Sequence, residues 1–260
     1  MNAMRPSWRF VLLFVALFAC YQAAELVGVR WLRSAWWQGV LMTAVIPLGL
    51  ALGAWLYGSA AAPFALEWRR GVAGWLALGL GGGVLLKAAA LVAGQAMGAY
   101  DVAPAAPSPL APLLQAVAFT LLATFVPSMA EDMLTRGLWW RHGPWRKGLG
   151  FGALSTAVYV LNHVWRLERG PSEWLLLSCF GLAYACALLR AGSLWGAVGF
   201  HWGWNAANGL LPLAFDVQVR APVLAVTASA VAHLVLAALC LFVPMPLFGA
   251  RRVRGAGDAA

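Results

Sequence analysis

Charged side chains are scarce in this chain. Only 10% of its 260 residues are Asp, Glu, Lys or Arg, whereas 62% are hydrophobic. A soluble domain carries roughly 25% charged residues, so this composition leaves too little polar surface to coat a particle in water. The scarcity excludes a soluble enzyme or binding domain and predicts that most of the surface contacts lipid.

Paired cysteines and several common catalytic patterns are also absent. The sequence has no CxxC pair and no GxSxG, HExxH or P-loop pattern, so it indicates neither a serine hydrolase of the GxSxG type, nor an HExxH metalloprotease, nor a P-loop NTPase. All four cysteines lie within apolar runs, where they behave as small buried hydrophobic residues. They are Cys20, Cys179, Cys186 and Cys240.

Long apolar runs make up most of the chain. Crossing a bilayer takes about 20 residues, and eight runs between charged or Pro-rich breaks are long enough. The sequence therefore predicts an all-α polytopic membrane protein, with one transmembrane domain over 1–260 built as a bundle of about eight helices. The runs are roughly 8–28, 38–58, 71–98, 110–140, 148–165, 173–190, 193–213 and 222–245.

Basic residues outnumber acidic ones, 18 to 9, and fall in short clusters between the apolar runs. In a soluble protein this excess would suggest nucleic acid as a partner, but between membrane spans it indicates topology. With the N-terminus inside, eleven of the Lys and Arg residues lie in inner segments and five in outer segments, which fits the positive-inside rule. We therefore expect membrane lipid and not nucleic acid as a partner.

This charge distribution also predicts an orientation. Both termini are expected in the cytoplasm, including a short basic tail at 246–260. The expected location is a bacterial inner membrane or another cell membrane.

The first cluster of ionisable residues interrupts the fourth run. Polar groups at membrane depth are costly, so each is a functional hypothesis. Asp132 and Arg136 are four residues apart on a helix and can pair, which leaves Glu131 about 100° around the helix without a partner there. Such a carboxylate can act as a general base. The alternative is that these charges mark the cytoplasmic end of a span and reach water.

Two further polar clusters each carry a histidine. Tyr159 and His163 are four residues apart in the fifth run, and His201, Asn205 and Asn208 share one helical face in the seventh. An imidazole and two amides in an apolar helix need partners inside the bundle. Each cluster either contributes to a chemical site or supplies hydrogen bonds between helices.

Helix geometry allows the three clusters to meet. Glu131 lies ten residues before Arg141, and His201 lies eleven residues after Arg190, which places them about 15 and 16 Å from the inner surface. His163 is about 24 Å deep if its run is helical throughout. We expect one shared pocket that opens toward the cytoplasm.

Taken in order, these motifs resemble those of one family of intramembrane proteases. An acidic pair followed by Arg, then an aromatic-xxx-His, then a His-xxx-Asn is similar to the pattern of the CAAX prenyl protease and bacteriocin-processing (CPBP or Abi) family. The resemblance covers about 120–212. Asp132 stands where the family usually has a second Glu, and Tyr159 where it often has Phe. The matching residues are Glu131, Asp132, Arg136, Tyr159, His163, His201 and Asn205.

The resemblance implies hydrolysis of a peptide bond in or beside the membrane, and thus an endopeptidase. Glu131 and His163 would activate a water molecule, and His201 and Asn205 would donate hydrogen bonds to the developing oxyanion. The substrate would be a peptide or membrane protein, lipidated or not. The expected supporting residues are Asp132, Arg136, Tyr159 and Asn208.

A metal-dependent scheme is the rival mechanism. It places a divalent ion such as zinc on His163, His201 and Glu131, with Asn205 outside the ligand set. The metal-free scheme is preferred, because no helix turn presents two ligands at HExxH-like spacing.

Two non-enzymatic classes remain open. A proton-coupled transporter would use the same residues as a relay, but it predicts inverted repeats, whereas the polar residues here crowd into the second half. A catalytically silent scaffold or immunity protein of the same fold is the other alternative.

Overall fold

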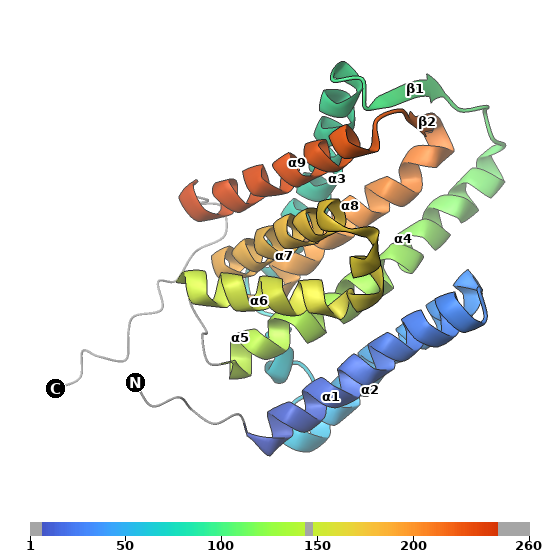
Figure 1. The fold of residues 1–260 in the computed structure, drawn as a ribbon. Helices are drawn as coiled ribbons and strands as arrows, with labels where there is room; N and C mark the ends of the chain where they lie inside the picture. Colours follow the sequence, from blue (N-terminus) through green and yellow to red (C-terminus); the bar gives the residue numbers. More distant parts are fainter. Residues whose placement is uncertain (1–6, 144–147, 244–260) are drawn as a thin grey trace.

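The computed structural model describes residues 7–143 and 148–243. The predicted basic tail at 246–260 lies outside the described residues, as do Arg5, Arg146 and Lys147 of the topology prediction. Within the described ranges the secondary structure is almost entirely helical, and the predicted all-α polytopic membrane fold is confirmed (Figure 1).

The first half of the chain begins with a helical hairpin. α1 (Trp8–Ala23) continues directly into the π-helical segment η1 (Ala24–Trp31), and α2 (Ala35–Tyr57) runs back beside it. Ser7 and Ser34 cap α1 and α2, because each side-chain oxygen accepts a hydrogen bond from a backbone N–H three residues later. The next elements are η2 (Ala62–Phe64), α3 (Val72–Ala96) and β1 (Tyr100–Pro104).

The second half contains the motifs. α4 (Leu110–Asp132), the π-helical turn η3 (Met133–Gly137) and α5 (Leu138–His142) form one continuous helix. Gly192, with a φ of 61°, ends α7 in the left-handed conformation that favours glycine. The remaining elements are α6 (Gly148–Asn162), the 3₁₀ segment η4 (Val164–Arg169), α7 (Pro171–Ala191), α8 (Leu194–Ala214), β2 (Phe215–Val219) and α9 (Pro222–Phe242).

Each predicted span coincides with a helix or a continuous run of helical segments, but the count of eight is not confirmed. Two of the eight predicted spans, α6 and α8, are not among the helices that are both long and apolar enough to cross a membrane. α6 has only 15 residues. In the part of the chain that the structure describes, six helices are long and apolar enough to cross a membrane: Trp8–Trp31, Ala35–Tyr57, Val72–Ala96, Leu110–His142, Pro171–Ala191 and Pro222–Phe242.

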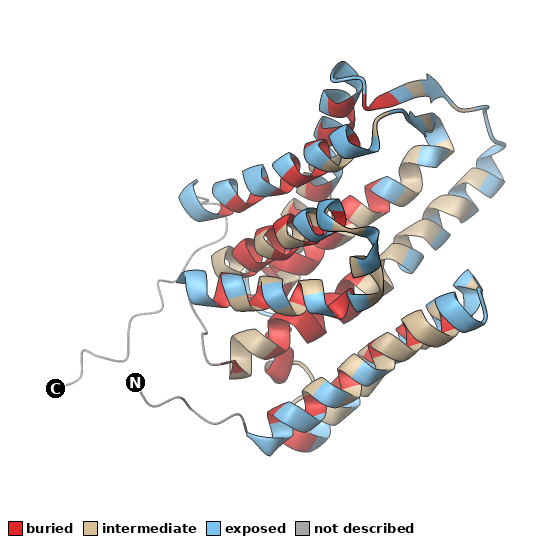
Figure 2. Ribbon diagram, in the orientation of Figure 1, coloured by how far each residue is buried: buried red, intermediate tan, exposed pale blue. Residues whose placement is uncertain are grey.

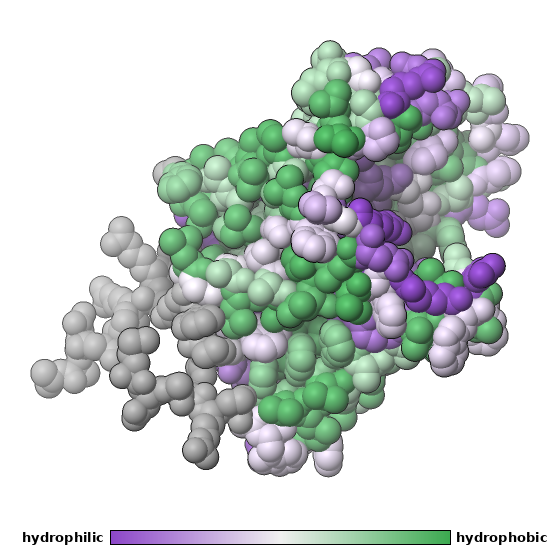
Figure 3. Space-filling model, in the orientation of Figure 1, coloured by the Kyte–Doolittle hydropathy of each residue, from purple (hydrophilic) through white to green (hydrophobic). Residues whose placement is uncertain are grey.

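The outer surface and the interior differ as a lipid-embedded bundle requires. Large apolar side chains cover much of the outside (Figure 3), and Trp55, Leu85 and Phe242 are more than 70% exposed. Such a surface would be unstable in water, so the chain is an integral membrane protein. Buried residues gather in α7, α8 and the segment from Ser128 to Leu138 (Figure 2).

A two-stranded ribbon is the one departure from helix that the sequence did not predict. β1 pairs antiparallel with β2, so that Tyr100 lies opposite Val219, and Arg220 forms an ion pair with Asp101 at 2.6 Å. The sequence 101–109 is rich in proline and lies between two predicted spans. The partner strand lies more than a hundred residues away, and local sequence does not indicate such a pairing.

Glycines fix the depth of α8 against α3. Gly79 and Gly83 of α3 face Gly199 and Gly203 of α8, and a Cβ atom on Gly83 would lie only 2.7 Å from the backbone nitrogen of Trp204. Small residues four apart on both helices allow this close backbone approach. The contact holds α8, and with it His201, in a fixed place inside the bundle.

Candidate active site

Glu131 lies at the centre of a buried polar cluster. One oxygen of its carboxylate, Oε1, accepts a hydrogen bond of 2.7 Å from the hydroxyl of Tyr21 on α1. The other oxygen, Oε2, lies 3.5 Å from Nε2 of His163 and 3.8 Å from Nε2 of His201. The structure thus brings together the carboxylate and the two imidazoles that the sequence places on three separate helical segments.

Hydrogen bonds on the far side of each ring assign the proton positions. Nδ1 of His163 contacts the backbone carbonyl of Tyr159 at 2.8 Å, and Nδ1 of His201 contacts Oδ1 of Asp132 at 3.1 Å. A carbonyl or carboxylate oxygen accepts hydrogen bonds, so both Nδ1 atoms carry the proton. In the neutral rings each Nε2 is then an acceptor.

Three acceptor atoms therefore converge on one position. They are Oε2 of Glu131 and Nε2 of His163 and His201, and Oε2 is buried without a hydrogen-bond partner among the described residues. Acceptors do not satisfy one another, and a buried unpaired carboxylate oxygen is costly. The position between them suits a donor such as a water molecule.

Asp132 and Arg136 support the cluster from the side away from the water position. Arg136 pairs with Asp132 four residues earlier, as the spacing predicts, and both side chains are fully buried. The guanidinium also lies over the rings of Tyr159 and Tyr184, 4.5 and 5.2 Å from their centroids. Because Asp132 also contacts His201, it couples the charge of Arg136 to the orientation of that imidazole.

A π-helical turn follows the acidic pair and is fastened to α6. The hydroxyl of Thr135 donates to the carbonyl of Glu131 at 2.7 Å, and Ser155 of α6 donates to the carbonyl of Thr135 at 3.1 Å. Single π-helical turns inside α-helices occur frequently at functional sites. Here the turn joins α6, which ends one residue before His163, to the helix that carries Glu131.

The two predicted amides of α8 have different surroundings. Nδ2 of Asn205 donates to the hydroxyl of Ser128 on α4 at 3.0 Å, and that hydroxyl donates to the carbonyl of Thr124 at 2.8 Å. This contact fixes the amide beside α4, one turn from His201. Asn208 lies farther along α8 and is exposed, and its supporting role stays a prediction.

Sequence reasoning missed two tyrosines that contact the cluster. Tyr21 holds Glu131, and the ring of Tyr184 stacks on His201 with centroids 4.6 Å apart. The hydroxyl of Tyr184 also lies 2.9 Å from Nε2 of His233 on α9. A tyrosine in an apolar run gives no signal of this kind, whereas a histidine within a span is itself an indication.

The predicted metal set was compared with this geometry. Two imidazoles and a carboxylate are donor types that zinc accepts. However, the described ranges 7–143 and 148–243 contain no group of three or more His, Cys, Asp or Glu residues arranged to hold a metal ion. In the metal-dependent scheme Oε2 of Glu131 and Nε2 of His163 and His201 would hold the ion, and that scheme stays a prediction.

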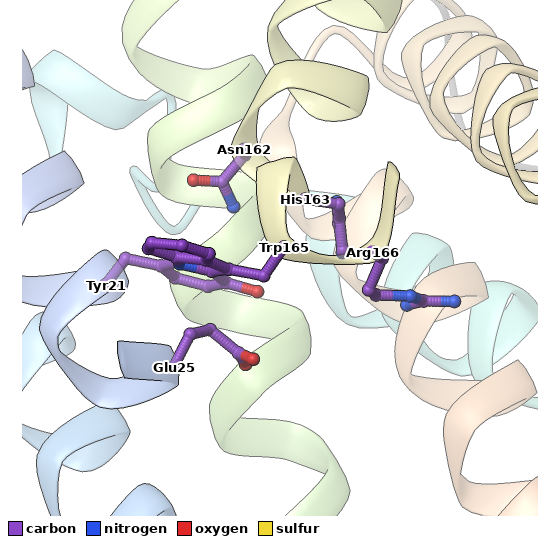
Figure 4. Close-up of a pocket in the computed structure, with 6 residues that line it drawn as sticks. All are labelled: Tyr21, Glu25, Asn162, His163, Trp165 and Arg166. Atoms are coloured by element: carbon purple, nitrogen blue, oxygen red, sulfur yellow. The ribbon is translucent and has the colours of Figure 1, made fainter. Parts of the chain in front are cut away.

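A small pocket lies beside His163, where the end of α1 faces η4 (Figure 4). It offers about 10 Å³ to water, close to the least volume that holds one molecule. The turn after α1, which contains η1, and the turn after α6, which contains η4, lie at one end of the bundle, opposite the start of α1 and the end of α9 (Figure 1). The pocket is lined by Tyr21, Glu25, Asn162, His163, Trp165 and Arg166.

Comparison with known proteins connects this geometry to a family. Residues 113–207 match the family model described as Type II CAAX prenyl endopeptidase Rce1-like. The resemblance to the CPBP family is confirmed. The match covers less than half of the chain but includes all three motifs, and it supports a membrane peptidase of the CAAX type in general. Neither the curated proteins nor the solved structures include a significant match to the chain.

Proposed function

We propose that the protein is an intramembrane endopeptidase in which Glu131 activates a water molecule for attack on a peptide bond. The observation that carries the proposal is the buried Oε2 of Glu131, unpaired and facing Nε2 of both His163 and His201. A water between these acceptors can donate to two of them at once, which orients its lone pair toward a substrate carbonyl.

The reaction begins with general-base catalysis. Glu131 takes a proton from the water while Nε2 of His163 accepts its second hydrogen bond, and the hydroxide oxygen forms a bond to the carbonyl carbon. The carbonyl electrons move to oxygen. The C–N bond then breaks, and the proton held by Glu131 passes to the departing nitrogen. A positioned base of this kind contributes about 10²- to 10⁴-fold to the rate.

The oxyanion needs donors, and the proton positions change the role predicted for His201. Its neutral ring presents an acceptor at Nε2, so it can donate to an oxyanion only when it has bound a second proton from solvent before the substrate enters. The carboxylate of Asp132 at Nδ1 compensates the positive charge that the ring then carries. Nδ2 of Asn205 supplies the other donor with the hydrogen that Ser128 does not engage.

Burial makes these interactions stronger. Glu131 and His201 are 7% and 2% exposed, and electrostatic interactions grow in a site from which bulk water is excluded. The remaining details of the proposal rest on the motifs: a peptide or membrane-protein substrate, lipidated or not, in a bacterial inner membrane or another cell membrane.

The test compares membranes that contain the native chain with membranes that contain the Glu131→Gln variant. The amide has the same shape as the carboxyl but cannot take a proton, so uncleaved precursors should accumulate only in the variant membranes. Glu168→Gln, at a carboxylate whose side chain is 66% exposed, is the matched control. Identical peptide patterns from all three membranes would reject the proposal and favour a silent scaffold.

A further inference from the structure

Tyr21 of α1 reaches the catalytic carboxylate from outside the matched segment. α1 contributes none of the three motifs and lies before residues 113–207. Yet Tyr21 is only 2% exposed, and its hydroxyl donates to Oε1 of Glu131 across 110 positions of sequence. Among the described residues this is the one hydrogen bond that the carboxylate of Glu131 accepts, and it engages the oxygen that does not face the histidines.

We propose that Tyr21 is a positioning residue that selects which oxygen of Glu131 acts as the base. This inference rests on the proposed function. By engaging Oε1, the hydroxyl fixes the rotation of the carboxylate and turns Oε2 toward His163 and His201. Without it the carboxylate is free to rotate about its last bond, and a displacement of about 1 Å at a reacting group can cost about 100-fold in rate.

The next residue of α1, Gln22, strengthens the inference, because it contacts the residue that precedes His163. Nε2 of Gln22 donates to the backbone carbonyl of Asn162 at 2.8 Å and to its side-chain oxygen at 3.2 Å. Asn162 is the last residue of α6 and directly precedes His163. One turn of α1 therefore contacts both Glu131 on α4 and the end of α6, next to His163.

The main experiment is Tyr21→Phe, which removes only the hydroxyl. The expected result is a fall in kcat of roughly 10- to 100-fold with KM unchanged, because substrate contacts remain while the base loses its orientation. Tyr100→Phe is the matched control: Tyr100 is also buried, and its hydroxyl contacts the carbonyl of Ala225 at 3.5 Å, away from the site. The control should retain the native kcat.

A purely structural role for Tyr21 gives a different pattern. In that case Tyr21→Phe would lower the thermal stability as its main effect and would change kcat no more than Tyr100→Phe does, and the inference would be overturned. An active native chain is the reference for both variants. If the native chain cleaves nothing, the proposed function fails; if it cleaves and Tyr21→Phe matches it, only the positioning role fails.

A double-mutant cycle gives a second measurement. Glu131→Asp shortens the side chain by one methylene and takes the carboxylate away from the Tyr21 hydroxyl. If Tyr21 acts through Glu131, removing its hydroxyl should cost much less in the Glu131→Asp background than in the native chain. Where Glu131→Asp turns over too slowly, the same cycle is measured on thermal stability, and strict additivity there contradicts the pairing.

Discussion

The segment that matches the family and the helices that flank it contribute differently to the site. Residues 113–207 supply every group in the proposed reaction, whereas α1, α3 and α9 supply groups that hold them. Tyr21 holds Glu131, the glycines of α3 set the depth of α8, and His233 contacts the tyrosine that stacks on His201. Reactive groups carry a sequence signal because their chemistry restricts the residue type, whereas many residue types can provide support.

Among the residues that hold the reactive groups, the largest effect should come from Asp132, which lies in the matched segment and contacts both Arg136 and His201. Asp132→Asn leaves the buried charge of Arg136 without an opposite charge beside it, and removing one partner of a buried ion pair costs about 3–5 kcal/mol of stability. The amide of Asn keeps an acceptor oxygen, but the negative charge beside Nδ1 of His201 is lost. We expect loss of both thermal stability and cleavage, measured by unfolding in detergent and by peptide assay.

Asp132→Glu sharpens this prediction, because it restores the acidic residue that the family usually carries. The longer carboxylate should keep Arg136 paired and His201 oriented, so stability and activity should remain near native. Full activity in Asp132→Asn would show that the buried pair has no part in orienting His201.

A smaller effect is expected at Asn205, which donates to the oxyanion in the proposed mechanism. Asn205→Ala removes the amide donor, and loss of one such donor costs about 10²- to 10³-fold in kcat. Gln218→Ala, on the exposed strand β2, removes an amide outside the site and serves as the control. Equal kcat values for the two variants would remove Asn205 from the oxyanion site.

The flanking helix α3 should affect stability more than chemistry. A methyl group on Gly83 would lie 2.7 Å from the backbone nitrogen of Trp204, and overpacking of this kind costs about 1–3 kcal/mol. Gly81→Ala is the matched control on the same helix, because the space around Gly81 is open. Gly83→Ala should unfold at a lower temperature than Gly81→Ala. Equal unfolding temperatures would mean that α3 and α8 do not pack so closely.

The metal-dependent scheme gives a further test. In the metal-free mechanism Glu131 and His163 activate the water without an ion, so cleavage should continue after chelation of divalent ions. Loss of activity on chelation, with recovery on adding zinc, would contradict the metal-free mechanism.

The predicted orientation in the membrane decides which side of the membrane the pocket beside His163 is nearer to. If both termini are cytoplasmic, the end of the bundle that carries η1 and η4 lies on the outer side, and with it the residues that line the pocket beside His163. Labelling with an impermeant thiol reagent tests this orientation. In a background without native cysteines, Ser34→Cys should react from outside and Trp68→Cys should not; the opposite pattern would place the termini outside.

Much of this fold was predictable because apolar length sets where membrane helices lie. The pairing of Asp132 with Arg136 follows from helical spacing alone. The pairing of β1 with β2, the contact between Asp132 and His201 and the bond from Tyr21 to Glu131 were not predictable, since each joins residues at least 69 positions apart. Such contacts depend on how helices pack, which local sequence patterns do not specify.

The most direct measurement uses the precursor that accumulates with the Glu131→Gln variant. The purified native protein and the variant are each mixed in detergent with this precursor at enzyme excess, so that one turnover is observed. If Glu131 is the base, the native protein cleaves the precursor at a single peptide bond and the folded variant shows an undetectable rate. Cleavage by Glu131→Gln at the native rate would contradict the role of Glu131 as the base.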